Sequence, residues 1–143
     1  MRLITLLIFL SLTACGKFES KKAIIDQALL PHIEQYKIDK KIHLGISDIE
    51  YIDVVFGELN RGQVGVCYIY DGGYKIIYID RVYWSGMDES TKLVLIYHEM
   101  GHCDLGIMEH SEDYTIMGEY LMSGVDFNMN RDYYLNLLFK EHK

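Results

Sequence analysis

The chain has 143 residues, half of them hydrophobic, and its formal net charge is −7 at pH 7. This length indicates one domain that is large enough to bury a core of its own. The acidic balance leaves no basic patch, which argues against a nucleic-acid partner.

The N-terminus has the order of a secretory signal peptide. Residues 1–15, MRLITLLIFLSLTAC, start with a basic residue, continue as an apolar run from Leu3 to Leu12 and end in small residues before Cys15. The run is shorter than the ~20 residues that a membrane-spanning helix needs. We therefore expect a cleaved leader; an ordinary signal peptide cut nearby and an uncleaved anchor are the alternatives.

The residues Leu-Thr-Ala-Cys at positions 12–15 resemble the lipobox of bacterial lipoproteins. The resemblance implies a signal peptide at residues 1–14, a lipid on Cys15, and a single domain at residues 15–143 that this lipid anchors to a membrane of the cell envelope. Gly16 stands where an aspartate commonly retains such proteins at the inner membrane, which favours the outer membrane. The domain would face the periplasm or the exterior.

The part of the chain after Cys15 predicts a helix and then a strand. Apolar residues at helical spacing between Glu19 and Tyr36 predict an N-terminal helix, and Pro31 would kink this helix or start a new turn. Residues 48–56, DIEYIDVVF, then predict a strand.

A hairpin and two further helices complete the predicted order. Residues 64–70 (VGVCYIY) and 74–80 (YKIIYID) predict a hairpin around an Asp-Gly-Gly turn. Residues 90–103 (STKLVLIYHEMGHC) predict a helix, with Asp88 or Ser90 as its N-cap. Residues 131–142 (RDYYLNLLFKEH) predict an amphipathic C-terminal helix after an irregular stretch. The fold class is therefore α+β: a small, mainly antiparallel sheet packed against these three helices.

The pentapeptide HEMGH at positions 98–102 is the most informative motif. On a helix, His98 and His102 project from one face one turn apart, as two imidazoles must to bind one zinc ion. Glu99 lies beside them as the general base for a zinc-bound water. A chance match on a structural helix is the alternative.

A catalytic zinc site needs a third protein ligand. His110 would lie ~12 Å beyond His102 if the helix continued, but Gly106 can end the helix in a left-handed conformation and return the chain. His110 is therefore the favoured ligand, and Glu119 is its main rival. Three other acidic neighbours also compete as ligands: Glu109, Glu112 and Asp113. His110 could instead be a solvated loop histidine.

The segment HEMGHCDLGIMEH, followed by TIMGEY, resembles the metzincin zinc metallopeptidases and small bacterial lipoproteins with metallopeptidase motifs. The resemblance implies that Met117 is the methionine of a tight turn beneath the metal, with Met122 as an alternative. The metzincin glycine and last ligand are third and sixth after the second histidine. Here Gly106 is fourth and His110 is eighth, so the loop is two residues longer.

The two cysteines beyond Cys15 can form one bridge in an oxidising compartment. A Cys67–Cys103 disulfide would attach the end of the HEMGH helix to a neighbouring strand. Two buried free thiols are the alternative.

Together, these features predict a zinc metallopeptidase, a hydrolase that cleaves peptide bonds in a peptide or protein substrate by means of a zinc-bound water activated by Glu99. Tyr120 is a candidate oxyanion donor. Zn²⁺ is the expected cofactor, and the membrane is a partner through the lipid anchor. A non-catalytic zinc-binding envelope lipoprotein, in which Glu119 or Asp113 closes the metal site, is the alternative function. An envelope protein without metal is a third.

Overall fold

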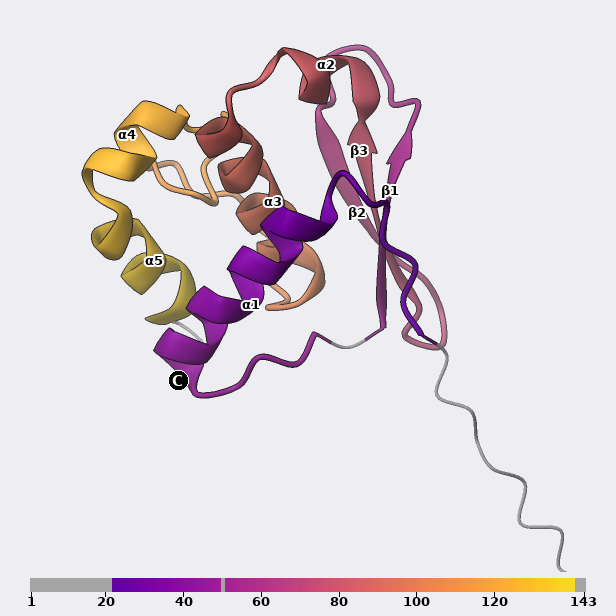
Figure 1. Cartoon of the computed structure of the whole chain (residues 1–143), viewed down its shortest axis with the longest axis horizontal. Helices are drawn as coiled ribbons and strands as arrows, with labels where there is room; N and C mark the ends of the chain where they lie inside the picture. The colour runs from indigo at the N-terminus through magenta and orange to yellow at the C-terminus, as the bar shows by residue number, and fades with distance from the viewer. Residues whose placement is uncertain (1–21, 50, 141–143) are drawn as a thin grey trace, which may run out of the picture.

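A computed structural model describes residues 22–49 and 51–140 of the chain. The predicted signal peptide and the lipidation site Cys15 lie outside these residues. The described part has five helices and three strands, with the sheet on one side, most of the helices on the other and the short helix at residues 81–86 at one end of the sheet (Figure 1). The predicted α+β class is confirmed. Within the described ranges, no helix has the length and apolar character needed to cross a bilayer.

The N-terminal helix begins later than the sequence predicts. Helix α1 spans Leu30–Leu44, whereas the chain before it is extended enough for Ile25 to form an isolated bridge with Val54. Pro31 fits this start, because it occupies the first turn, where its missing N–H leaves no bond unmade. The chain before the helix instead pairs with Val54, whose carbonyl accepts the N–H of Asp26 at 2.9 Å. Pro31 therefore starts the helix rather than kinking it.

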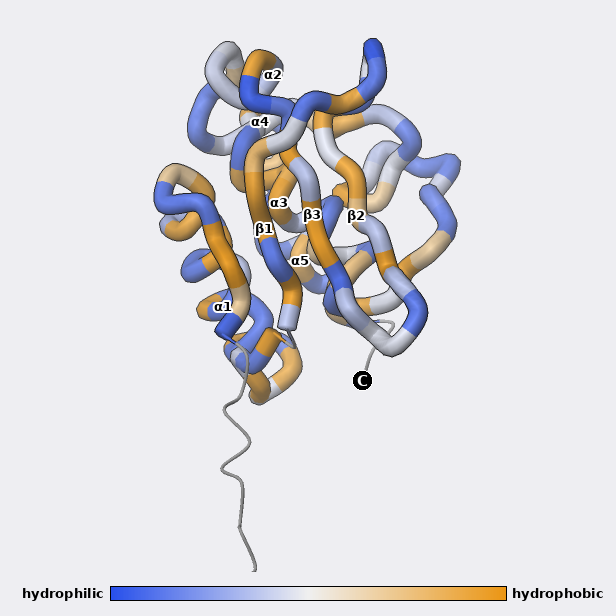
Figure 2. The backbone as a smooth tube through the Cα atoms, turned by 90° about the vertical axis from the view of Figure 1, so that its right-hand side faces the viewer, coloured by the Kyte–Doolittle hydropathy of each residue, from blue (hydrophilic) through white to orange (hydrophobic). Residues whose placement is uncertain are grey.

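The sheet is mixed rather than mainly antiparallel. Its strands are β1 (Ile52–Gly57), β2 (Gly65–Ile69) and β3 (Lys75–Asp80), in the order β1-β3-β2. The β2–β3 hairpin is antiparallel as predicted, but β1 pairs with β3 in parallel. Strand β3 takes the centre, and its Ile76, Ile77 and Ile79 are buried. No helix covers the outer face of the sheet in Figure 2.

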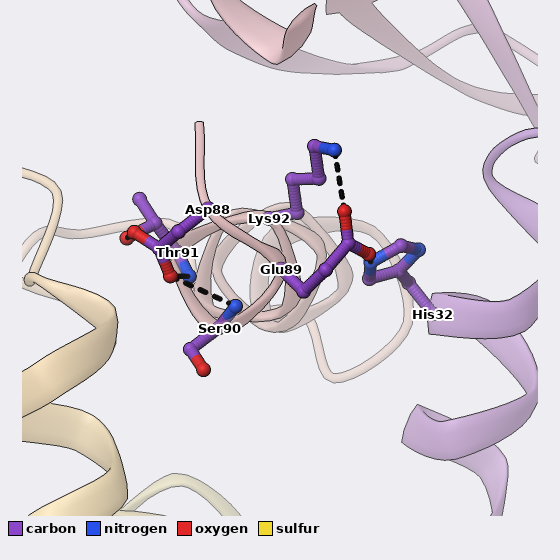
Figure 3. A network of polar contacts seen from close by, with 6 residues as sticks. All are labelled: His32, Asp88, Glu89, Ser90, Thr91 and Lys92. Atoms are coloured by element: carbon purple, nitrogen blue, oxygen red, sulfur yellow. Dashed lines mark hydrogen bonds and ion pairs between the residues drawn. The ribbon is translucent and has the colours of Figure 1, made fainter. Parts of the chain in front are cut away.

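Two capped helices follow the sheet. Helix α2 spans Arg81–Gly86, and helix α3, which carries the HEMGH motif, spans Glu89–Cys103. Asp88 is the N-cap of α3 and accepts the backbone N–H groups of Ser90 and Thr91 at 3.0 Å each. Glu89 lies between Lys92 and His32 of α1 in Figure 3, which connects the start of α3 to α1.

Part of the predicted irregular stretch is helical. Helix α4 spans Gly124–Met129 and leads directly into α5, which spans Arg131–Lys140. Gly124 permits α4 to touch α3, because a Cβ at this position would lie 2.5 Å from the backbone nitrogen of Thr91. The core lies between the sheet and the helices, with α3 largely buried at its centre.

Candidate metal centre

The three histidines of the predicted metal site meet. His98 and His102 project from α3, and their Nε2 atoms are 3.2 Å apart. The Nε2 atom of His110 lies 3.2 Å from that of His102. One ring nitrogen from each histidine can be chosen so that all three lie within 4.8 Å of one another. The three side chains are therefore close enough to bind a single metal ion.

The chain reaches His110 by the turn that the sequence predicts. The carbonyl of Met100 accepts the N–H groups of Asp104 and Leu105 at the end of α3. Gly106 has φ +72°, the left-handed conformation that glycine adopts without strain. The N–H of Ile107 then bonds back to the carbonyl of Gly101 at 2.9 Å, so the loop turns toward the helix instead of extending its axis.

Backbone carbonyls fix the orientation of two of the rings. Nδ1 of His98 lies 2.7 Å from the carbonyl oxygen of Ile116, and Nδ1 of His102 lies 2.5 Å from that of Ile107. A carbonyl oxygen only accepts, so each Nδ1 carries the proton and each Nε2 presents a lone pair. The two Nε2 atoms therefore face each other as acceptors, an arrangement that a shared cation stabilises.

Glu99 and the three histidines line one cleft, and Glu99 is buried. Its side chain is 3% exposed, and its Oε2 atom has no hydrogen-bond partner in the described structure. Burial raises the pKa of Glu99 to about 8. Burial also lowers the pKa of His98 to about 4 and lowers that of His102, the direction expected for imidazoles removed from water.

Strand β2 forms one wall of this cleft, which has a volume of about 430 Å³. Gly65 of β2 is in direct contact with the carboxylate, since a Cβ at this position would lie 2.5 Å from Oε1 of Glu99. The histidines and Glu99 line the helical side, and Glu119 lies at the rim as an exposed residue. The cleft thus joins three nitrogen donors, an unpartnered carboxylate oxygen and a strand.

Comparisons with known proteins add no family. No family model, curated protein or solved structure matches the chain.

Met117 lies beneath the site. The turn from Thr115 to Gly118 is closed by the N–H of Gly118 on the carbonyl of Thr115 at 3.0 Å. The side chain of Met117 is 7% exposed and packs where a Cβ at Gly101 of the HEMGH motif would be. The same turn supplies the Ile116 carbonyl to His98, so it supports the helix by packing and by a hydrogen bond. Met122, the alternative, is fully buried in the core.

Other predicted site residues lie outside the histidine cluster. Tyr120, the candidate oxyanion donor, is 77% exposed and is not part of the cleft lining, so the structure gives it no place in the site. Asp113 lines a separate hollow between the loop and α5. Glu119 borders the cleft but does not join the three histidine nitrogens.

A disulfide joins Cys67 of β2 to Cys103, the last residue of α3. Its Cα atoms are 5.7 Å apart, within the usual range for a disulfide. The bridge connects the strand that forms one wall of the cleft to the helix that forms the other, directly beside His102.

Three groups that shape the site were not predicted from the sequence. The carbonyls of Ile107 and Ile116 orient the rings, and a backbone oxygen leaves no mark on the identity of its residue. Gly65 had a usable signal, because a glycine inside a strand often marks a close approach of another group.

Proposed function

We propose that the protein is a zinc-dependent metallopeptidase of the cell envelope, with His98, His102 and His110 as ligands and Glu99 as general base. One observation carries the proposal: a buried carboxylate with an unpartnered oxygen shares a cleft with three converging histidines. A buried polar atom without a partner is unfavourable, and a ligand or a water at the site would relieve it. The resemblance of the HEMGH segment to metzincins supports the same function.

The donor set fits zinc. Three imidazoles with room for a further group are a typical catalytic zinc site, whereas structural sites close with four protein ligands. Imidazole nitrogens suit zinc better than they suit magnesium or calcium, which prefer oxygen. The carbonyls of Ile107 and Ile116 hold two of the rings with Nε2 available, as partners of metal-binding histidines generally do.

In this proposal, the chain itself contributes proton transfer and positioning. The zinc would supply Lewis-acid polarisation of the scissile carbonyl and would make water more acidic. Glu99 accepts a proton from water at Oε2 and delivers it to the nitrogen of the leaving amine. Gly65 leaves the space that the carboxylate occupies, and Met117 supports α3 from below.

Strand β2 offers a way to bind an extended substrate. It is an edge strand, since it pairs with β3 on one side and with no other described strand on the other side. The residues 63–67 line the cleft. A peptide that adds to this edge as a further strand would lie beside the histidines and Glu99.

We place this activity in the envelope. The predicted lipid on Cys15 would anchor the domain at a membrane, and the Cys67–Cys103 disulfide is the kind of bond that an oxidising compartment maintains.

Replacement of Glu99 tests the function. Glu99→Gln should retain stoichiometric zinc, measured by mass spectrometry of the purified protein, because Glu99 is not a proposed ligand. Hydrolysis of a fluorogenic peptide library should fall about 10²–10⁴-fold, the usual contribution of a general base. Glu109→Gln is the matched control, since Glu109 is exposed on the loop beside His110 and should leave both readouts unchanged.

Retained hydrolysis in Glu99→Gln would contradict the role of this residue. If the wild-type chain binds zinc but cleaves no peptide, and Glu119→Ala removes the metal, the site is closed by a fourth ligand and the protein is a non-catalytic zinc-binding lipoprotein.

A further inference from the structure

Large apolar side chains are exposed together at one end of the sheet. They come from the extended segment before α1, the start of β1 and the β2–β3 hairpin, and we call them the end patch: Ile24, Tyr51, Ile69, Tyr70 and Tyr74. Their exposed fractions range from 38% to 60%. Figures 1 and 2, which share a vertical axis, both show the start of the described chain, the start of β1 and the hairpin turn at the lower end of the molecule.

Hydrogen bonds hold these segments side by side. The buried Asp53 of β1 accepts the backbone N–H of Ile24 at 2.7 Å and the hydroxyl of Tyr74 at 2.8 Å. The rings of Tyr70 and Tyr74 stack with their centroids 5.7 Å apart. Ile69 and the first residue of β1 are both opposite Lys75 in the sheet register. The segments that carry the end patch therefore lie side by side at one end of the sheet.

The start of the described chain lies at the same end of the sheet as the end patch, which indicates what this surface faces. The described chain starts at Lys22, and the predicted lipidation site Cys15 precedes it by 22 − 15 = 7 residues. Seven extended residues span at most about 25 Å, at roughly 3.6 Å per residue. A lipid on Cys15 would therefore keep the start of the described chain within about 25 Å of the bilayer surface.

The composition of the end patch suits the headgroup region of a bilayer. Tyrosine combines an apolar ring with a polar hydroxyl, and it is enriched where protein crosses from hydrocarbon to water. The charged residues within two positions of the patch in the described chain nearly balance, with Lys22 and Lys75 against Asp26, Asp53 and Asp71. Binding should therefore depend on the rings rather than on charge.

We propose that the end patch is a contact surface for the interfacial layer of a phospholipid bilayer, and that it orients the lipid-anchored domain on its membrane. The proposal depends on lipidation of Cys15 and on none of the metal chemistry, so it can fail while the metallopeptidase function holds, and the reverse. A second copy of the chain, paired through the same end, is the competing occupant.

Tryptophan at two positions tests the orientation. Full-length Tyr70→Trp and Val82→Trp proteins are purified from membranes and reconstituted in phosphatidylethanolamine–phosphatidylglycerol vesicles with and without brominated acyl chains. Val82 is the matched control, because it is 79% exposed on α2 at the opposite end of the sheet. Both side chains are exposed, so the exchanges should leave the fold intact, and the native Trp84 gives the same background in both proteins.

We expect bromolipid to quench the tryptophan at position 70 at least about twofold more than the one at position 82, at low and at high salt, with a blue-shifted emission for position 70 only. Equal quenching at the two positions would overturn the proposal. A blue shift at position 70 that depends on protein concentration and is insensitive to bromolipid would assign the patch to a second copy. Protein that mass spectrometry shows to lack a lipid on Cys15 would also overturn it.

Discussion

Two polar clusters lie on opposite faces of helix α3, and they differ in how completely their groups are paired. The metal-side cluster consists of His98, Glu99 and His102 together with His110 from the loop. The other cluster, which we call the clamp, joins Tyr97 of α3 and its C-cap Asp104 to α1 and α5. Glu99 is buried and the clamp is largely buried, yet only the clamp has partners for all its buried polar groups.

The clamp consists of two ion pairs with matching hydrogen bonds. Asp39 of α1 accepts from the hydroxyl of Tyr97 and from Arg131 of α5. Asp104 accepts from the hydroxyl of Tyr36 at 2.6 Å and from Lys40 at 2.8 Å. Burial and the neighbouring carboxylates raise the pKa of both tyrosines, so both remain protonated donors.

The metal-side cluster is incomplete by comparison. Two imidazole lone pairs point at each other, and Oε2 of Glu99 has no partner. A protein that pairs the buried polar groups on one face of a helix, and leaves a buried polar atom unpaired on the other, has a functional reason for the second face. The difference separates a cluster that holds the fold together from one that is arranged to bind.

The largest expected effect is the loss of metal on replacement of a ligand. His102→Ala should abolish stoichiometric zinc binding, because even the loss of an outer-shell partner weakens a metal site roughly 10–100-fold. His43→Ala is the matched control, since His43 is a half-buried histidine that stacks on Phe139, far from the cluster in the fold. Mass spectrometry of the native protein measures both. Full zinc content in His102→Ala would place the metal elsewhere.

A break in the clamp should reduce stability and leave metal binding intact. Lys40→Met removes the charge that pairs with Asp104, whose side chain is 6% exposed. An unpaired buried carboxylate costs about 3–5 kcal/mol, which urea denaturation would show as a lower free energy of unfolding. Lys37→Met is the control: its partner Glu34 is exposed, so the change should stay within about 1 kcal/mol.

Equal destabilisation by the two lysine variants would contradict the description of the clamp as a buried, fully paired network. Loss of zinc in the folded Lys40→Met protein would show that the two clusters are coupled, and would erase the distinction between them.

The sequence predicts the metal-side cluster better than it predicts the clamp. Helical spacing predicts that His98 and His102 share one face of the helix, and Gly106 predicts the turn that brings His110 back to them. The clamp joins residues that are 58 to 92 positions apart, and such pairs leave no local periodicity. Long-range packing, rather than local pattern, therefore determines which charged residues are buried.

The same limit explains two of the corrections in the fold. The hairpin is local and is correctly predicted, whereas the parallel pairing of β1 with β3 is a non-local choice that strand patterns do not record. The late start of α1 is also non-local, because the chain before the helix pairs with Val54 of β1 although its apolar residues have helical spacing.

The smallest expected effect concerns the space that holds Glu99. Gly65→Ala would place a methyl group 2.5 Å from Oε1 and 2.9 Å from Cδ of Glu99, so the carboxylate must move. Overpacking of this kind costs about 1–3 kcal/mol in stability. Zinc should remain bound, because the nearest atoms to a Cβ at Gly65 belong to Glu99 and not to the three histidines. Peptide hydrolysis should fall, because the general base is displaced.

Gly86→Ala provides the matched control, because a Cβ at Gly86 meets no atom within 4 Å and the residue ends a helix of its own. Zinc content, urea denaturation and peptide hydrolysis should all stay at wild-type values in this variant. If Gly65→Ala gives the same results as Gly86→Ala in all three measurements, the carboxylate of Glu99 can move aside without cost, and its contact with β2 does not hold it in place. The contrast between an unpaired but fixed carboxylate and a fully paired clamp would then lose its structural basis.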